Sequence, residues 1–249
     1  MKTMSYNILC WGKEGHEREK REPMVIEIIS KNNPDTFGVQ EATPEWMKCL
    51  KSNLTDYSYV GVGRDDGADE GEYSAVFYKK EKYEAKESGN FWLSETPEKP
   101  GKGWDAVCVR ICSWVLLEDK ETKESFIHLN THLDHIGVEA RKEGMKLIFE
   151  KAESFSVPII VTGDFNFEQG SDFYEGLVSG RLCDSKFVAE ISDDGITYNG
   201  FGENDGGIID FIMVSPEFKV KKYTVVNEKI NGEYPSDHFP VTAEIEIRK

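Results

Sequence analysis

No apolar run in this sequence is long enough to cross a membrane. A spanning helix needs about 20 apolar residues in succession, whereas the apolar runs here are short, as at residues 159–161. Residues 1–10 also lack the apolar core and the small-residue cleavage site of a secretory signal peptide. We therefore expect a cytoplasmic protein without membrane insertion, and a leader removed from a precursor stays an open alternative.

Basic residues are few relative to acidic ones. The chain has 30 Lys and Arg against 46 Asp and Glu, which gives a formal net charge of −16. Nucleic-acid-binding proteins usually carry a basic surface, because neutralised phosphates supply most of the non-specific affinity. A protein of this charge repels a long polyanion. We therefore expect that long duplex nucleic acid is not a partner.

Cysteine pairs at regular spacing are absent as well. The five cysteines suit neither a disulfide framework nor a compact zinc motif, so we expect free thiols in a reducing compartment. No internal repeat and no low-complexity linker divides the chain. A chain of 249 residues, of which 39% are hydrophobic, can bury a substantial core. We expect a single domain, residues 1–249, and a monomer.

Strand-like and helix-like stretches alternate along the chain. Strands are expected at 2–9, 36–40, 73–78, 107–117, 126–133, 158–162, 208–214 and 241–247. Helices are expected at 24–30, 44–50 and 138–155. Thr43 is the expected N-cap of the second helix. Buried strands mixed with amphipathic helices predict an α/β sandwich, with sheets inside and helices outside.

Polar and ionisable residues repeatedly lie within or just after these apolar strands. They are Asn7, Glu41, His132, Asp134, His135, Asp164, Asn166, Asp210, Asp237 and His238. Strand ends hold side chains rigidly, which suits catalytic groups. A single acidic residue after a strand is usually a solvated turn residue. Asp210 inside an apolar run is more informative, because burying its charge is costly without a partner or a metal.

Six segments together resemble the endonuclease/exonuclease/phosphatase superfamily. They are Met4-Ser-Tyr-Asn-Ile-Leu9, Val39-Gln-Glu41, Asn130-Thr-His-Leu-Asp134, Thr162-Gly-Asp-Phe-Asn166, Ile209-Asp-Phe-Ile212 and Ser236-Asp-His-Phe-Pro240. They follow the family's order from the first expected strand to the last, so the resemblance covers essentially the whole chain. It implies a DNase I-like fold, a four-layer α/β/β/α sandwich, and a divalent-metal-dependent phosphoesterase like the small bacterial single-domain members.

The resemblance also implies a role for each matching residue. It implies metal binding by Glu41, Asn7 and Asp237, and catalytic roles for His132, Asp164, Asn166, Asp210 and His238. Asp164 would orient or deprotonate the attacking water, and Asp210 would hold His238 near the phosphate. Asn7 and Asn166 would contact phosphate oxygens. Glu72 is a weaker match to a carboxylate that some members hold against the first histidine.

Elementary chemistry agrees with these roles. Carboxylate and amide oxygens are hard ligands that suit Mg²⁺ or Mn²⁺ better than zinc. Hydrolysis of a phosphoester needs an in-line water, neutralised phosphoryl oxygens and a stabilised leaving oxygen. A nearby carboxylate also favours the cationic form of a histidine. We therefore expect Mg²⁺ or Mn²⁺ as the cofactor.

Arg110 lies in the apolar run 107–117, where it is expected to share a strand face with Cys108 and Cys112. A buried guanidinium needs an anionic partner. One reading is a structural salt bridge, and the other is a substrate clamp, because a guanidinium matches a phosphate bidentately. Similarity of the segments at 91–97 and 103–105 to small bacterial family members favours the clamp.

Several aromatic residues lie near the motifs and are candidates to contact a substrate. Trp11 and Phe201 fall in polar loops that contain glycine, whereas core packing is the simpler account of Trp92 and Trp104. We therefore expect Trp11 and Phe201 to stack on a base or line a small pocket.

These observations predict an enzyme that hydrolyses a phosphodiester or a phosphomonoester on a small or short substrate. A nuclease acting on DNA or RNA is one alternative. A second is an inactive phosphate-binding module, against which the intact site residues argue. A third is a zinc or iron hydrolase using His132, Asp134 and His135, which leaves the Gly-Asp-Phe-Asn segment unexplained.

Overall fold

A mixed sheet of six strands forms one half of the molecule. The computed structural model describes residues 1–12, 14–178, 181–203 and 206–248. In spatial order, the strands of this first sheet are β11 (Phe218–Val225), β12 (Val241–Ile247), β1 (Lys2–Asn7), β2 (Thr36–Gln40), β4 (Val76–Lys79) and β3 (Tyr57–Val60). Strand β1 pairs in parallel with β2 and antiparallel with β12. The C-terminal ends of β1 and β2 therefore lie at the same edge of the sheet.

A second sheet of six strands packs against the first. In spatial order, its strands are β5 (Tyr83–Trp92), β6 (Ile111–Asp119), β7 (Ser125–His132), β8 (Ile159–Asp164), β10 (Asp210–Val214) and β9 (Cys183–Asp184). Strand β7 runs parallel to β8, with His132 beside Asp164 in the register. Strand β10 runs antiparallel to β8, with Asp210 opposite Asp164. This pairing sets three of the predicted site residues side by side at one edge.

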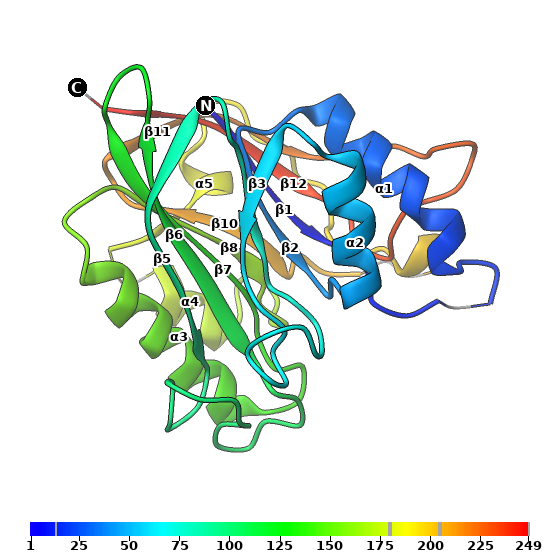
Figure 1. Cartoon of the computed structure of the whole chain (residues 1–249), viewed down its shortest axis with the longest axis horizontal. Helices are drawn as coiled ribbons and strands as arrows, with labels where there is room; N and C mark the ends of the chain where they lie inside the picture. The colour runs from blue at the N-terminus through cyan, green and yellow to red at the C-terminus, as the bar shows by residue number, and fades with distance from the viewer. Residues whose placement is uncertain (13, 179–180, 204–205, 249) are drawn as a thin grey trace.

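Helices lie outside both sheets, so that the molecule has four layers (Figure 1). Helices α1 (Arg18–Asn32) and α2 (Pro44–Asn53) pack on the first sheet, and α3 (Val138–Glu153) and α4 (Asp172–Val178) on the second. The short elements α5 (Ser185–Val188) and η1 (Gly200–Gly202) lie between strands. This arrangement confirms the expected α/β/β/α sandwich. Across the described part of the chain, no helix is long and apolar enough to cross a membrane.

Most of the expected elements are present, with ends shifted by a few residues. The strands expected at 36–40 and 241–247 have those bounds. The expected N-cap is confirmed, because the Thr43 side chain accepts a hydrogen bond from the backbone N–H of Trp46. The helix expected at 24–30 begins earlier, at Arg18. The structure also contains β3, β5, β9, β11, α4 and α5, which were not expected from the sequence.

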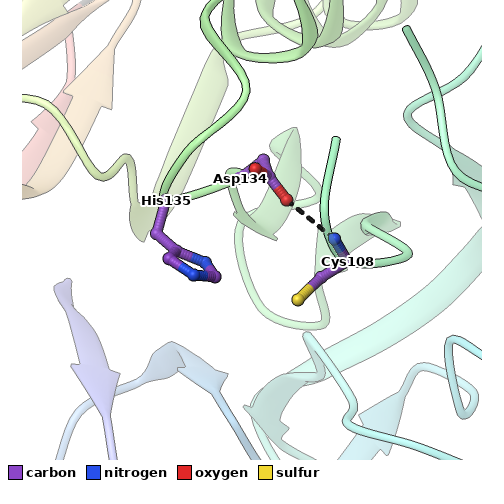
Figure 2. Close-up of side chains that lie close together, drawn as sticks. All are labelled: Cys108, Asp134 and His135. Carbon is purple, nitrogen blue, oxygen red and sulfur yellow. Dashed lines mark hydrogen bonds between the residues drawn. The ribbon is translucent and has the colours of Figure 1, made fainter. Parts of the chain in front are cut away.

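The expectation that Arg110 lies inside a strand is wrong, because β6 begins at Ile111. The backbone before it is held by Asp134 rather than by a neighbouring strand. The N–H groups of Val107 and Cys108 donate to this carboxylate over 3.2 and 3.0 Å, and the second of these bonds is drawn in Figure 2. The expected shared strand face of Arg110 and Cys108 is therefore wrong as well.

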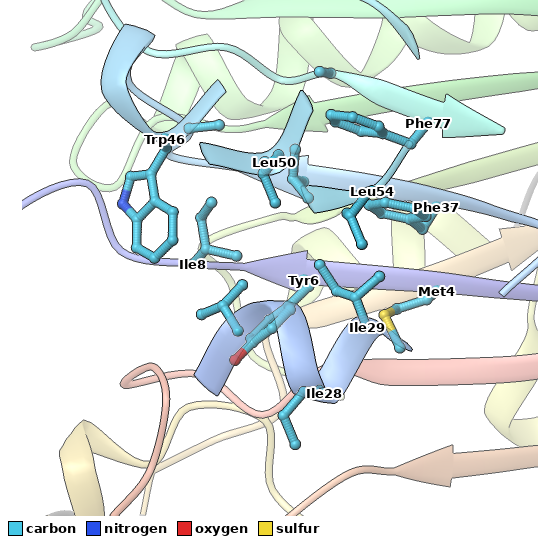
Figure 3. Packing of buried hydrophobic residues seen from close by; sticks show 14 of the residues in the cluster. Met4, Tyr6, Ile8, Ile28, Ile29, Phe37, Trp46, Leu50, Leu54 and Phe77 are labelled. Atoms are coloured by element: carbon cyan, nitrogen blue, oxygen red, sulfur yellow. The ribbon is translucent and has the colours of Figure 1, made fainter. Parts of the chain in front are cut away.

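Three clusters of buried apolar side chains separate the layers. Between the first sheet and its helices, the rings of Phe37 and Phe77 stack with centroids 4.9 Å apart, and Trp46 is fully buried (Figure 3). The cluster between the two sheets surrounds a polar contact, in which His128 bonds to the hydroxyls of Thr36 and Thr162 at 2.8 and 2.9 Å. His128 therefore joins the sheets, and burial lowers its pKa to about 3.

Candidate active site

The predicted site residues converge where the ends of five strands meet at one edge of the sandwich. Asn7, His132 and Asp164 are the last residues of β1, β7 and β8. Glu41 directly follows β2, and Asp210 begins β10. Because β1 also contacts β8 across the two sheets, these ends lie together although the residues are far apart in the sequence.

Glu41 is held by hydrogen bonds from the end of β1. Its carboxylate accepts one from Asn7 Nδ2 at 3.0 Å and one from the backbone N–H of Cys10 at 2.9 Å. Burial opposes ionisation, but the bonds from Cys10 and Asn7 hold the pKa of Glu41 below its ordinary value. The site therefore contains an ionised carboxylate with a fixed orientation, as a metal ligand requires.

Asp164 lies at the centre of the site. One carboxylate oxygen accepts a hydrogen bond from Asn7 Nδ2 at 2.9 Å, and the other from the backbone N–H of Asn166 at 3.0 Å. Its Oδ2 is 3.4 Å from His132 Nε2 and 3.8 Å from His238 Nε2. Burial, with the nearby charge of Asp210, raises the pKa of Asp164 to about 7. A carboxylate of this pKa can exchange a proton near neutral pH.

His238 and Asp210 form a buried pair. The imidazole Nδ1 lies 2.9 Å from Asp210 Oδ2, and both side chains are almost fully buried. Burial alone would lower the pKa of His238, but the charges of Asp210 and Asp164 outweigh it and raise the pKa to about 10. The ring is therefore cationic at neutral pH. Its Nε2 points toward Asp164, which makes it a donor at the centre of the site.

His132, unlike His238, is neutral at neutral pH. Burial and the positive charge of Arg110 hold the pKa of His132 well below its ordinary value. The neutral ring accepts a hydrogen bond at Nε2 from Asn166 Nδ2 over 3.0 Å, so its proton lies on Nδ1. Asn166 also donates to the Leu133 carbonyl at 2.9 Å. The site thus contains one cationic and one neutral histidine.

A divalent cation fits the acidic side of this site. Burial and the charge of Glu41 raise the pKa of Asp237, although His238 opposes them, so the two carboxylates repel each other in the absence of a cation. Ligand atoms of Glu41, His132 and Asp164 also lie within 4.8 Å of one another. Carboxylate oxygens are the donors that Mg²⁺ and Mn²⁺ prefer. The Asn7 amide nitrogen donates hydrogen bonds to the carboxylates of Glu41 and Asp164. The role of Asn7 as a metal ligand stays a prediction.

Arg110 is buried beside this site. Its Nε lies 3.7 Å from Asp134 Oδ2, and its Nη2 lies 3.2 Å from His135 Nδ1. The salt bridge that the sequence offered as one reading is therefore present. The charge of Arg110 also lowers the pKa of His132, so the guanidinium acts electrostatically on the site. Its role as a phosphate clamp stays a prediction.

The residues of the zinc or iron alternative do not form one group. Among the described residues, His132 groups with Glu41 and Asp164, whereas His135 groups with Asp134 and Cys108 (Figure 2). Asp134 accepts four backbone N–H bonds, which hold the turn that follows β7. These bonds hold its pKa at about 2, against the effect of burial. Asp134 is therefore accounted for as a structural residue.

Two arginines near the site, one buried and one half-buried, lie in no motif and were not predicted from the sequence. Arg21 is fully buried in α1 and donates to backbone carbonyls of the loop that follows β1. Arg64 donates from Nη1 to Glu72 at 2.6 Å. Glu72 is the weaker match to a carboxylate that some family members hold against the first active-site histidine. In the structure, Glu72 accepts a hydrogen bond from Arg64. A buried arginine has no local sequence signal, since its partners here come from distant segments or from the backbone.

Comparisons with known proteins identify the family of the chain. The model of the endonuclease/exonuclease/phosphatase family matches residues 4–238. A crystal structure of a family member from Bacteroides thetaiotaomicron is 40% identical, with a TM-score of 0.95 over 98% of this chain and 97% of that one. No curated protein sequence matches the chain.

Two further solved structures are similar. A mannosyl-6-phosphatase from Bacteroides thetaiotaomicron is 40% identical, with a TM-score of 0.94 over 99% of this chain and 100% of that one. The catalytic domain of human nocturnin shares the fold at 19% identity, with a TM-score of 0.79 over 100% of this chain and 93% of that one. With its DNase I-like sandwich and a family match that spans nearly all of its length, the chain belongs to the endonuclease/exonuclease/phosphatase family.

Proposed function

We propose that the protein is a Mg²⁺- or Mn²⁺-dependent phosphatase that hydrolyses a compact phosphomonoester. Members of its family are phosphoester hydrolases. The observation that carries the proposal is the position of Asp164, with a pKa raised to about 7, between His132 and His238 at 3.4 and 3.8 Å. A base, a cationic donor and a neutral imidazole in contact suit the transfer of a phosphoryl group to water.

Glu41 and Asp237 are the residues that would hold the metal. When bound, the cation neutralises phosphoryl oxygens and stabilises the charge that develops during hydrolysis. Glu41 is prepared for this role because its ionised form is already stabilised by Asn7 and Cys10. The mutual repulsion of Glu41 and Asp237 favours the bound state further.

Asp164 is proposed to orient the attacking water and accept its proton. Both of its oxygens are fixed by hydrogen bonds, so the carboxylate needs little reorganisation. Cationic His238, held by Asp210 at 2.9 Å, would donate from Nε2 to a phosphoryl oxygen. Asn166 would exchange its hydrogen bond to His132 for one to a further phosphoryl oxygen, since its two amide N–H groups are engaged with His132 and the Leu133 carbonyl.

The choice of a compact phosphomonoester rests on charge and on a relative. The net charge of −16 opposes the approach of a long polyanion. The relative described as a mannosyl-6-phosphatase is 40% identical over nearly the whole chain, which favours a phosphorylated sugar over a nucleic acid.

Hydrolysis of a panel of substrates tests the proposal, followed as phosphate release from the monoesters and as ester or strand cleavage of the diesters. The panel contains a hexose 6-phosphate, glycerol phosphate, a short phosphodiester and a DNA oligonucleotide, each with Mg²⁺, with Mn²⁺ and with a chelator. We expect metal-dependent release from the phosphomonoesters, and a loss of at least about 100-fold in His238→Ala. Equal release by this variant, or no release from any phosphomonoester with either metal, contradicts the proposal.

A further inference from the structure

A small cleft opens beside the acidic side of the active site. Its volume is about 190 Å³, and its lining includes Leu9, Trp11, Tyr198, Phe201 and Asp237. Asp237 is the residue that the cleft shares with the proposed metal site. Pockets that enclose drug-sized ligands are larger, at roughly 300–1,000 Å³. The cleft therefore suits one ring-sized group placed next to the phosphate.

The Trp11 side of the cleft has a fixed backbone and an exposed ring. Buried Arg21 donates from Nη2 to the carbonyls of Leu9 and Trp11, at 2.8 and 3.3 Å. The indole N–H of Trp46 donates to the same Leu9 carbonyl at 3.0 Å. The Trp11 side chain is nevertheless 73% exposed. The backbone at Trp11 is therefore fixed, while the exposed aromatic ring beside the active site has surface available for a ligand.

The Phe201 side is tied to the catalytic segment. The backbone N–H groups of Asn199 and Gly200 donate to the Asp237 carbonyl at 2.7 and 3.0 Å. Phe201 follows with a φ of +61°, a left-handed conformation that is unusual for a bulky residue. Its ring stacks on His16, with centroids 3.7 Å apart and an angle of 12° between the planes. Strain of this kind is typical of functional segments, and the bonds to Asp237 and the stacking on His16 hold Phe201 in the wall of the cleft.

Tyr198 connects the cleft to the catalytic histidine. Its ring packs edge-on against His238, with centroids 5.1 Å apart, and the two residues form an isolated β-bridge. A group bound between Trp11 and Phe201 would therefore lie within one side chain of the residues proposed to act on the phosphate.

We infer that Trp11 and Phe201 form the subsite for the leaving group, and that the group bound there is a single sugar ring. The inference rests on the proposed phosphatase function and names its substrate class. Aromatic surfaces pack against the apolar face of such a ring. The cleft is also lined by the acidic residues Glu203 and Asp237, and a carboxylate only accepts hydrogen bonds. The hydroxyl groups of a sugar supply donors, whereas a second phosphate would be repelled.

Paired substrates separate this subsite from the catalytic machinery. Hexose 6-phosphate carries the ring, and glycerol phosphate carries hydroxyls and a phosphate but no ring. We expect Trp11→Ala to raise KM for hexose 6-phosphate about tenfold, equivalent to about 1.4 kcal/mol, with kcat nearly unchanged. Glycerol phosphate should be turned over as by the wild type, and Trp11→Phe should restore most of the affinity for the hexose.

Phe187→Ala is the matched control. Phe187 is 64% exposed and lies in α5, outside the lining of the cleft, so this variant should behave as the wild type with both substrates. Equal effects of Trp11→Ala on the two substrates, or no effect on either, overturn the inference. A larger dependence on Trp11 for a nucleoside monophosphate than for the hexose also overturns it, because the subsite would then bind a base.

Calorimetric titration distinguishes a failed inference from a failed proposed function. If the wild type hydrolyses no phosphoester, the proposed function fails, and the affinity for hexose 6-phosphate still tests the subsite. Binding that Trp11→Ala weakens about tenfold, with glycerol phosphate binding unchanged, supports the sugar subsite without turnover. Equal hexose binding by wild type and variant rejects it.

Discussion

Two site residues have an unusual backbone conformation. Glu41 and Asn166 adopt φ values of +61° and +52°, in the left-handed region that residues other than glycine seldom occupy. Each lies just beyond the end of a strand, where the chain turns. Hydrogen bonds on both side chains hold these turns: Glu41 accepts from Asn7, and Asn166 donates to His132. The motifs identified both residues, but only the fold shows how each side chain is directed into the site.

The pairing of Asp210 with His238 leads to a prediction about pH. The charge of Asp210 is the main cause that raises the pKa of His238, to about 10. The His238 ring therefore stays cationic as the pH rises to about that value. In Asp210→Asn this cause is removed. The alkaline fall in kcat/KM should therefore move to lower pH, and activity at neutral pH should drop by about 100-fold or more. A pH profile of kcat/KM measures both effects.

A buried aspartate elsewhere in the same sheet provides the control for this prediction. Asp184 is 3% exposed and accepts a hydrogen bond from the Tyr174 hydroxyl at 2.9 Å, so Asp184→Asn should leave the pH profile unchanged. His238→Ala and the double variant with Asp210→Asn should lose similar amounts of activity, because residues that act as a unit are not additive. Multiplication of the two single losses would show that the pair does not act together.

Among the structural elements, regular patterns were found from the sequence and interrupted ones were not. Strand β2 is buried throughout and was predicted with its exact bounds at 36–40. Strand β11 alternates buried and exposed residues, but a register shift between Val220 and Lys222 interrupts the alternation. Strand β5 lies at a sheet edge, and residues 84–88 are exposed. Its charged middle therefore does not resemble a buried strand.

Helix α1 positions the loop that carries Trp11. Arg21 lies in its second turn and donates to the carbonyls of Ile8, Leu9 and Trp11, with the shortest bond 2.6 Å long. It also donates to the Pro235 carbonyl at 3.2 Å, just before the segment with Asp237 and His238. One guanidinium thus joins two of the three chain segments that border the cleft, which the sequence gives no means to predict.

Replacement of Arg21 should therefore destabilise the protein strongly. In Arg21→Met, several buried carbonyl groups lose their donor, and we expect the free energy of unfolding to fall by about 3 kcal/mol. Urea unfolding followed by circular dichroism measures this loss. Arg18→Met is the control in the same helix, since Arg18 pairs with Glu19 and Glu22 at the surface. That change should cost less than about 1 kcal/mol, and equal losses in the two variants would contradict the role given to Arg21.

The whole molecule combines a cluster of polar residues at strand ends with a strongly acidic overall charge. The resemblance of six short segments predicted the α/β/β/α sandwich and the identity of the residues that meet at its edge, because five of the segments include a strand end and the sixth directly precedes β12. It did not predict the cleft beside Asp237, because this cleft depends on two loops brought together by Arg21 and by backbone bonds to Asp237. The net charge of −16 opposes the approach of long polyanions more than that of small phosphoesters.

The response to salt follows from this charge. A compact ligand with one phosphate carries no condensed counterion layer to release, so only ordinary screening acts on it, and its affinity should change little between about 50 and 200 mM salt. A protein that grips 6–10 phosphates of duplex DNA instead loses about 10³–10⁵ over the same range. We expect kcat/KM for hexose 6-phosphate to show the weak dependence, measured at constant Mg²⁺ with His238→Ala as the blank. Efficient cleavage of plasmid DNA that falls steeply with salt would contradict this expectation, because it requires a basic surface that neutralises many phosphates despite the net charge of −16.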